Sequence, residues 1–338
     1  MLGGVDFLFG AWYFIKDIEK EMSIMLDTFL ATVSSMMVMF ICILVGFILR
    51  KCKAAPENTG TVLSKLVMSV FLPAQALDAF MRNCTFESIA SQYQVVLYGA
   101  VAIVISLVIG IPLSCLFSKD RDQRNIYRYS LVFANFGYLG NAIVPLVMGE
   151  EMLYSYILFT LPLYVVLYAW GVNSLTPKGK GNKTGLLKSL LKPPVVSLII
   201  GMVLGLSGVS RVVPDFVSSA LSSLAGCMGP VAMLLTGFIV GGYEIGKILK
   251  NGKVYIATVL RLAVLPAVIA AALYVLGADK NTVILAAIGF GAALGLNTVV
   301  VPAAYDGDTH TGAAMALVSH LSAVVTIPLM YALLNWVL

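Results

Sequence analysis

Apolar stretches long enough to cross a lipid bilayer follow one another along almost the whole chain of 338 residues. A membrane-spanning helix needs roughly 20 apolar residues in a row. Ten such stretches cover residues 26–49, 62–81, 93–117, 127–148, 152–172, 194–209, 216–240, 255–276, 283–302 and 313–338. Charged residues make up only 12% of the chain, against about 25% in an ordinary soluble domain. The sequence therefore predicts an all-α polytopic membrane protein with ten transmembrane helices.

Lysine and arginine gather in every second connection between these stretches, after the first, third, fifth and seventh. The connection after the fifth stretch, "TPKGKGNKTGLLKSLLKP", alone holds five lysines. Cytoplasmic loops carry the excess of positive charge in membrane proteins. We therefore expect the basic loops in the cytoplasm and both termini outside. The net charge of +5 then reflects orientation in the bilayer and not nucleic-acid binding.

Two segments lie outside the predicted bundle. Residues 1–21 include "WYFIKDIEKE" but no signal-peptide cleavage pattern. They are expected to form an interfacial helix, or else an extension ahead of a start at Met22 or Met25. The basic segment 174–192 is expected to be a flexible cytoplasmic linker between two halves, with a docking site for a partner as the alternative.

Signs of catalysis or metal binding are absent from the sequence. The five cysteines have no metal-ligand spacing and suggest no disulfide framework. The motifs of serine hydrolases, zinc metalloproteases and P-loop ATPases are missing as well. We expect no catalytic residue, no metal and no cofactor, and the coupling ion, H+ or Na+, stays open.

The fourth and ninth stretches resemble each other. "LVFANFGYLGNAIVPLVMGEE" and "AAIGFGAALGLNTVVVPAAYDGD" both pass through glycine, then asparagine, then a proline four or five residues later. This predicts that residues 22–173 and 193–338 are two copies of one five-helix unit. Because five crossings are an odd number, the second copy enters the membrane upside down. Such inverted repeats are typical of secondary transporters.

Glycine, asparagine and proline interrupt both repeated stretches at matching places. Broken helices survive within a membrane only inside protein or beside a water-filled cavity. The inverted symmetry would bring both breaks together, where the N-terminal ends of half-helices offer a positive seat for an anion. Close helix packing by small residues is the alternative. The candidate substrate-binding residues are Asn135, Gly137, Gly140, Asn141, Pro145, Gly295, Asn297 and Pro302.

Three ionisable residues inside predicted spans are candidates for ion coupling or charge pairing. Asp78 is expected to carry a proton or to lie as a carboxylate near the outer interface. Arg261 is expected to pair with a substrate carboxylate or, as the favoured interpretation, to extend to the cytoplasmic face. His320 is expected to relay a proton or to be a hydrogen-bonded structural residue.

Several short motifs occur in a characteristic order. They are "GFILRK" at the end of the first stretch, "LP" in the second, Asn135-x-Gly137-x-x-Gly140, "LRLAVLP" in the eighth, and Asn297 followed by Tyr305 and "DGD". In this order the chain resembles the auxin efflux carrier family, which includes plant PIN auxin carriers and bacterial permeases for malonate and related acids. The resemblance covers nearly the whole chain after Met22.

The resemblance implies ten helices in two inverted repeats, with helices 4 and 9 broken and crossing. It also implies a scaffold of helices 1, 2, 6 and 7 that forms a homodimer through helices 2 and 7, and a transport domain that moves like an elevator. Two prolines typical of the family are replaced here by Ala142 and Ala293, which leaves the positions of the breaks open.

The function expected from these features is secondary transport of small organic anions, such as mono- or dicarboxylates, across the cell membrane by alternating access. A membrane-embedded sensor that binds an anion without moving it is the alternative.

Overall fold

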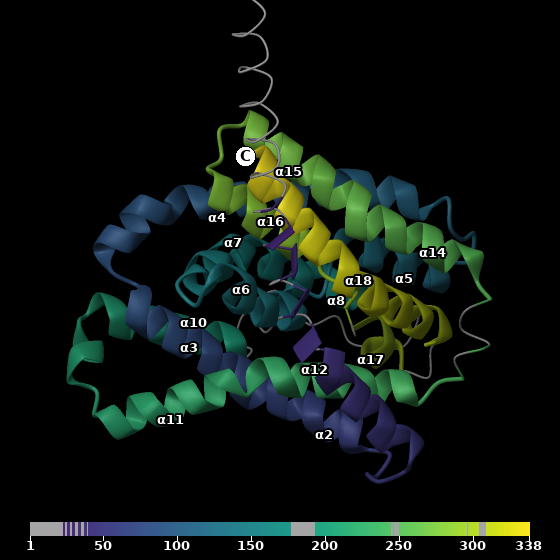
Figure 1. The fold of residues 1–338 in the computed structure, drawn as a ribbon, viewed down its shortest axis with the longest axis horizontal. Coiled ribbons are helices and arrows are strands. Elements are labelled where there is room, and N and C mark those ends of the chain that lie inside the picture. The colour runs from purple at the N-terminus through teal and green to yellow at the C-terminus, as the bar shows by residue number, and fades with distance from the viewer. Residues whose placement is uncertain are drawn as a thin grey trace, which may run out of the picture.

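The computed structural model describes residues 40–176, 193–244, 250–295, 297–303 and 309–338, with scattered positions between 23 and 38 and residue 246 (Figure 1). The expected N-terminal extension and most of the expected linker lie outside these residues. Within the described part, every regular element is a helix. The all-α prediction is therefore confirmed.

The helices follow the predicted stretches in chain order. The first stretch ends in helical residues 40–51. The remaining elements of the first half are α2 (Thr59–Leu66), the π-helix η1 (Val67–Phe71), α3 (Leu72–Asn83), α4 (Phe86–Ser114), α5 (Arg121–Val132), the π-helix η2 (Phe136–Gly140), α6 (Asn141–Met148), α7 (Met152–Val166), the π-helix η3 (Leu167–Gly171) and α8 (Val172–Ser174).

The second half repeats this alternation of long and interrupted helices. Its elements are α10 (Pro193–Leu206), the short 3-10 helix η4 (Val209–Val212), α11 (Asp215–Gly226), α12 (Met228–Gly241), α14 (Gly252–Val259), the π-helix η5 (Leu260–Val264), α15 (Leu265–Val275), α16 (Lys280–Gly291), α17 (Asn297–Ala303) and α18 (His310–Val337).

Six helical stretches of the described part are long and apolar enough to cross a membrane. They are Thr59–Asn83, Phe86–Ser114, Met152–Gly171, Asp215–Gly241, Gly252–Val275 and His310–Val337. Val195–Leu206 and Lys280–Gly291 are shorter apolar helices. Each of the six coincides with one predicted stretch, whereas stretches four, six and nine form shorter helices.

The helices form two groups that each combine elements from both halves of the chain (Figure 1). In the first group, α3 packs along α10 and α11, and α12 packs against α2. In the second group, α4 packs against α5 and α7, α15 against α16, and α18 against α14 and α16. We call these the α3 group and the α4 group. This mixing places α6, from stretch four, beside α12.

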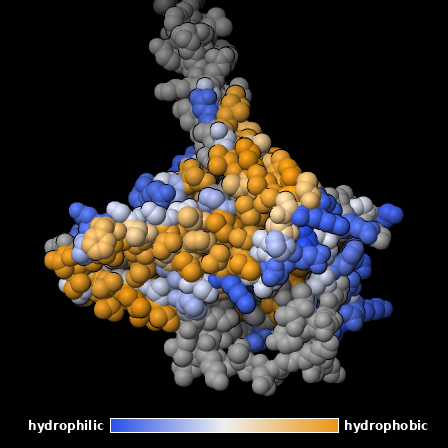
Figure 2. Space-filling view, turned by 90° about the horizontal axis from the view of Figure 1, so that it is seen from below, coloured by the Kyte–Doolittle hydropathy of each residue, from blue (hydrophilic) through white to orange (hydrophobic). Residues whose placement is uncertain are grey.

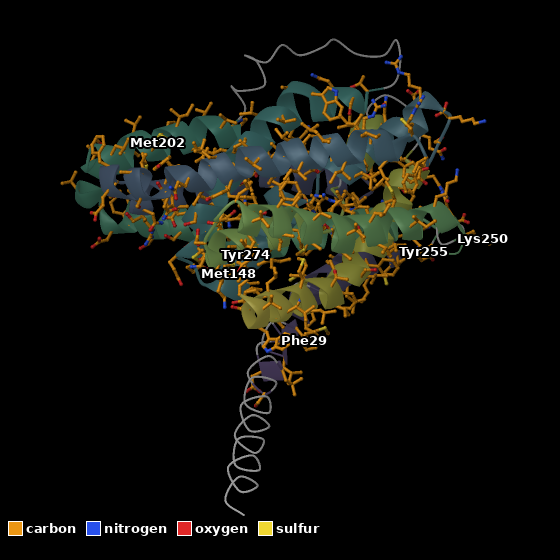
Figure 3. The ribbon with its side chains drawn as sticks, turned by 90° about the horizontal axis from the view of Figure 1, so that it is seen from above. Phe29, Met148, Met202, Lys250, Tyr255 and Tyr274 are labelled. Atoms are coloured by element: carbon orange, nitrogen blue, oxygen red, sulfur yellow. The ribbon has the colours of Figure 1, made fainter. Side chains whose placement is uncertain are left out.

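The outer surface of the bundle suits a lipid environment. Figure 2 shows a broad hydrophobic face with hydrophilic side chains gathered mainly toward one end. Large apolar side chains such as Val104, Val108 and Val203 are exposed on the surface of the bundle, as a bilayer requires. Figure 3 shows nitrogen-bearing side chains near the edge where Lys250 lies, whereas Met202 lies at the opposite edge.

The two repeated stretches are broken, but the breaks are not at their prolines. Stretch four leaves the helix at Phe133, whose backbone is extended, and stretch nine does so at Ala292. Pro145 and Pro302 instead lie inside α6 and α17. A proline within a helix frees the carbonyl four residues earlier, which for Pro145 is Asn141. That carbonyl accepts a hydrogen bond from Gln75 Nε2 at 3.3 Å, so the helix continues.

Candidate functional site

The two breaks meet in the middle of the molecule. Ala134 and Leu294, which are far apart in sequence, form an isolated antiparallel bridge. The Asn135 N–H donates to the Ala293 carbonyl at 2.7 Å. Two extended segments therefore cross and satisfy each other's backbone, which is how non-helical backbone is tolerated at membrane depth. We call this contact the crossing.

Four helix ends converge on the crossing. Helices α5 and α16 end there, and η2 and α17 begin there. Asn297 Nδ2 donates to Tyr129 Oη at 2.8 Å, which ties the start of α17 to α5. The Leu294 N–H donates to Ser319 Oγ of α18 at 2.9 Å. The crossing is thus held by polar contacts from two neighbouring helices.

Three buried amide side chains, one of them at the crossing, each keep one polar atom without a hydrogen-bond partner among the described residues. These atoms are Asn135 Nδ2, Asn141 Oδ1 and Gln75 Oε1. Buried polar atoms nearly always have hydrogen-bond partners. The unpartnered amides therefore mark a place where a ligand or water completes the hydrogen bonding. Sequence reasoning found Asn135 and Asn141 but missed Gln75, whose signal was an amide two residues after Pro73 in an apolar span.

The candidate glycines of stretch four make close approaches to tyrosines. A Cβ on Gly140 would meet the Tyr156 hydroxyl, and one on Gly137 would lie 2.7 Å from Tyr164 Oη. Tyr156 is fully buried and donates to the Phe136 carbonyl at 3.0 Å. These two glycines allow close packing around the crossing, which was the alternative interpretation. Gly295 differs, because its nearest neighbour would be 3.8 Å away.

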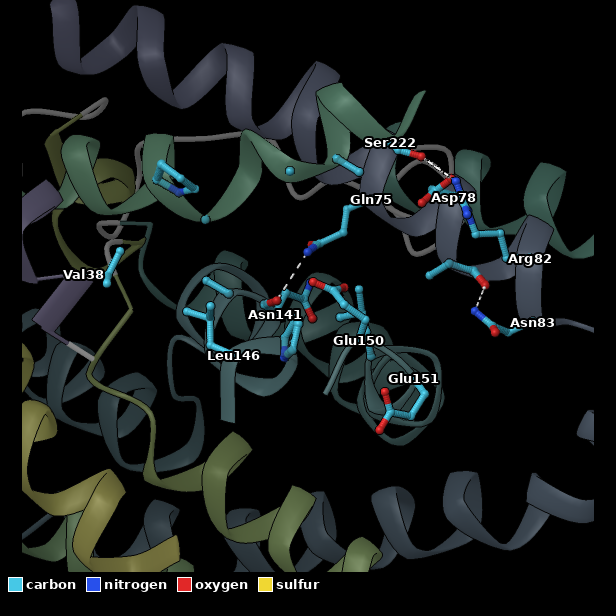
Figure 4. A pocket seen from close by; sticks show the side chains of 18 of the residues that line it. Val38, Gln75, Asp78, Arg82, Asn83, Asn141, Leu146, Glu150, Glu151 and Ser222 are labelled. Carbon is cyan, nitrogen blue, oxygen red and sulfur yellow. Dashed lines mark hydrogen bonds and ion pairs between the residues drawn. The ribbon is translucent and has the colours of Figure 1, made fainter. Parts of the chain in front are cut away.

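A cavity of about 600 Å³ lies between the two groups of helices (Figure 4). Gln75, Asn141 and Pro145 line it, so two of the predicted substrate-binding residues face this space. Its remaining polar lining residues are Asp78, Arg82, Asn83, Glu150, Glu151 and Ser222. The cavity connects α3 and α11 on one side with α6 on the other. Asn135 and Asn297 lie at the crossing itself.

Asp78 is paired across one turn of α3. Arg82 Nε contacts Asp78 Oδ1 at 2.8 Å, and Ser222 Oγ donates to the same oxygen at 3.3 Å (Figure 4). These contacts also join α3 to α11. Asp78 therefore lies in the cavity wall as a member of a small polar network.

Arg261 does not extend to the cytoplasmic face, and the favoured expectation for it was wrong. Its side chain is fully buried, and Nη1 donates to the Leu131 carbonyl at 3.4 Å. Its guanidinium carbon lies 5.3 Å from the centre of the Phe290 ring. Leu131 and Phe290 lie in the last turns of α5 and α16, and helix C-termini carry partial negative charge. These two helix ends offset part of the guanidinium charge, while Nε and Nη2 have no hydrogen-bond partner among the described residues.

His320 is a buried residue of α18. Its Nδ1 lies 2.7 Å from the carbonyl of Ala316, in the preceding turn of the same helix, and Nε2 has no hydrogen-bond partner within the described ranges. The contact of Nδ1 agrees with the interpretation of His320 as a hydrogen-bonded structural residue. Nε2 has no assigned role. Neither His320 nor Arg261 lines the cavity beside Asn141.

The sequence was also compared with known proteins. A family model described as "Membrane transport protein" matches residues 31–331. No curated protein matches the chain. The family match spans nearly all of the described helices, including both broken stretches and the cavity between the groups. The chain is therefore a multi-pass membrane protein that belongs to the auxin efflux carrier family of membrane transporters.

Proposed function

We propose that this protein is a secondary transporter that moves small organic anions across the cell membrane by alternating access. The single observation that carries the proposal is the crossing, where two broken helices meet beside buried amides that lack partners. A continuous helix would have been more stable in an apolar environment. The breaks therefore serve a purpose other than stability.

The crossing offers hydrogen-bond donors to a carboxylate. Asn135 Nδ2 is an N–H donor that no described residue accepts from, on a side chain that is only 3% exposed. η2 and α6 run on together from Phe136 to Met148, and a helix N-terminus favours negative charge. A carboxylate, which only accepts hydrogen bonds, suits this arrangement. Asn297 is committed to Tyr129, so we assign it to positioning the second half-helix.

The two groups of helices suggest how the cargo moves. We infer ten spans in two inverted repeats, with the α3 group and the first span as a dimeric scaffold. In this scheme the dimer forms through spans 2 and 7, and the α4 group moves past the scaffold. The cavity supports this division, because its walls come from both groups. The nitrogen-bearing side chains near Lys250 (Figure 3) support a cytoplasmic location for that edge. In this scheme both termini and the cavity mouth face outward.

Reconstituted vesicles test the proposal. Purified protein in liposomes should take up labelled mono- or dicarboxylates with saturation. Asn135→Leu removes the unpartnered donor at similar volume and should lower uptake by about tenfold or more, since one charge-assisted hydrogen bond contributes about 1.5–3 kcal/mol. Asn173→Leu is the control, because Asn173 lies in α8 and bonds the Ala169 carbonyl.

Three results would count against the proposal. Uptake that is unchanged in Asn135→Leu would remove the crossing as the anion site. Saturable binding of a carboxylate without any flux would instead support the sensor. The scheme assigns no catalytic residue, metal or organic cofactor, so loss of uptake on chelator treatment would also contradict it.

A further inference from the structure

The cavity between α3 and α6 has the wrong charge for an anion. It is lined by three carboxylates, Asp78, Glu150 and Glu151, and by one guanidinium, Arg82. Arg82 is already paired with Asp78. Glu150 and Glu151 take part in no ion pair within the described residues. The excess negative charge attracts cations into the cavity and repels anions.

Two buried amide oxygens line the same cavity without a hydrogen-bond partner. Gln75 is 7% exposed and Asn141 is 2% exposed, and their Oε1 and Oδ1 atoms accept no hydrogen bond from the part of the chain that the structure describes. The orientation of the Gln75 amide is fixed, because Nε2 donates to the Asn141 main-chain carbonyl. Turning the amide over would place two oxygens against each other. The cavity therefore presents acceptors that need a donor or a cation.

From this geometry we propose that the cavity binds one sodium ion beside Gln75 Oε1 and Asn141 Oδ1, with Glu150 as the nearest charge. Figure 4 shows Gln75 reaching from α3 toward Asn141, with Glu150 beside Asn141. Glu151 is turned toward Gly149 instead. The coupling of sodium to transport rests on the proposed function. Sodium binding does not, because it requires no cargo.

The ligand chemistry selects a hard monovalent ion. Carbonyl, amide and carboxylate oxygens suit hard cations. The described residues hold no cluster of three or more His, Cys, Asp or Glu side chains that suits a metal ion. Divalent ions are usually held by several carboxylates, whereas one carboxylate and two neutral amides balance a single charge. An amide oxygen is not protonated at neutral pH, so the site also favours sodium over a proton.

The position of the site explains how binding would be coupled to movement. Gln75 belongs to the α3 group, whereas Asn141 begins α6, which packs against α7 of the α4 group. Gln75 Oε1 and Asn141 Oδ1 can coordinate the same sodium ion only while the α3 group and the α4 group keep their present relative position. When the groups slide, the Gln75–Asn141 contact breaks and the ion loses a ligand. Asn141 also begins α6, one short π-helix after Asn135, so a cation there would offset the charge of an anion at the crossing.

Thermal unfolding of the purified full-length chain tests the site without cargo. Sodium chloride should raise the unfolding temperature with saturation, and potassium or choline chloride at equal ionic strength should not. Gln75→Leu should weaken the apparent sodium affinity by about tenfold or more. Gln94→Leu, a glutamine of α4 outside the cavity, should leave that affinity unchanged. Equal stabilisation by all three salts would overturn the inference.

A second variant covers the case in which Gln75→Leu fails to fold. Glu150 is exposed, so Glu150→Gln should fold normally and weaken sodium binding several-fold by removing one charge. Glu57→Gln is its control, because Glu57 lies outside the cavity and faces Arg50 at 3.6 Å. Unchanged sodium affinity in Glu150→Gln would contradict the assigned ligand set.

Uptake measurements separate this inference from the proposed function. Carboxylate uptake should rise with external sodium and fall when choline replaces it. Saturable uptake that ignores sodium, or that follows a proton gradient instead, would overturn the sodium site and leave anion transport standing. Sodium-specific stabilisation without any carboxylate flux would support the site and overturn the proposed function.

Discussion

Replacing Gly140 by alanine should destabilise the protein through a single contact. The new methyl group would meet the Tyr156 hydroxyl, and Tyr156 Cζ would lie only 2.8 Å from it. Real Cβ atoms essentially never approach so closely, and the Tyr156 ring is fully buried. Tyr156 must therefore shift away and lose its hydrogen bond to the Phe136 carbonyl.

The expected loss follows from three terms. Overpacking costs about 1–3 kcal/mol, and a buried tyrosine hydroxyl that loses its only acceptor costs about 1–3 kcal/mol. Alanine regains about 0.5–1 kcal/mol over glycine within a helix. The net prediction is a loss of about 1–5 kcal/mol in the free energy of unfolding, with transport reduced because Phe136 begins the half-helix at the crossing.

Reversible unfolding in mixed detergent micelles measures this loss. Gly60→Ala is the matched control, because its Cβ would lie 3.5 Å from the Phe238 side chain, an ordinary contact. Tyr156→Phe removes the nearest clashing atom, so Gly140→Ala with Tyr156→Phe should be less destabilised than the sum of the single changes. Wild-type stability in Gly140→Ala, or strict additivity in the double variant, would refute the reasoning.

Four further predictions concern residues in and near the crossing. Arg261→Gln should lower the unfolding free energy by about 1–3 kcal/mol, because two helix C-termini lose their compensating charge. Membrane-impermeant thiol reagents should label Asn141→Cys but not Arg261→Cys, because Asn141 lines the cavity and Arg261 does not. Labelling of Arg261→Cys would contradict the buried position of Arg261. Pro145→Ala supplies a backbone N–H that can bond the Asn141 carbonyl, so the hydrogen bond from Gln75 to this carbonyl should weaken. The sodium affinity should then change, and an unchanged affinity would count against the hydrogen bond between Gln75 and Asn141. Gly295→Ala should keep near-wild-type stability, because its nearest neighbour would be 3.8 Å away; a large loss would show that the crossing is tighter than described.

Six of the predicted spans and the existence of two breaks could be predicted because they depend on local composition. Apolar length fixes where a helix can cross, and the repeated glycine–asparagine pattern marked stretches four and nine. The location of each break could not be predicted from the prolines. Pro145 stays within α6 because Gln75, from another span, takes the carbonyl that the proline frees. Such a partner depends on tertiary packing and leaves no trace in the local sequence.

Dependence on tertiary packing also explains why the favoured interpretation of Arg261 was wrong and why Gln75 was missed. An arginine near the end of an apolar stretch usually extends to water, but here two helix ends inside the bundle provide the negative charge. Their position becomes visible only once the crossing is known. Gln75 was missed because a single amide in an apolar span has no periodic pattern to distinguish it. Its role depends on the unpartnered oxygen and on the neighbouring Asn141.

The central claim is that the interruptions of stretches four and nine meet at one crossing that carries the cargo. Because Asn135 N–H bonds the Ala293 carbonyl, Ala134 and Leu294 form a non-hydrogen-bonded antiparallel pair, with Cα atoms about 4.5 Å apart. That distance suits a disulfide. In a chain whose native cysteines are replaced, Ala134→Cys with Leu294→Cys should form an intrachain disulfide in the membrane. Carboxylate uptake should stop on oxidation and return on reduction, while each single variant ignores the oxidant. Absence of the cross-link in a chain that still transports would contradict the account.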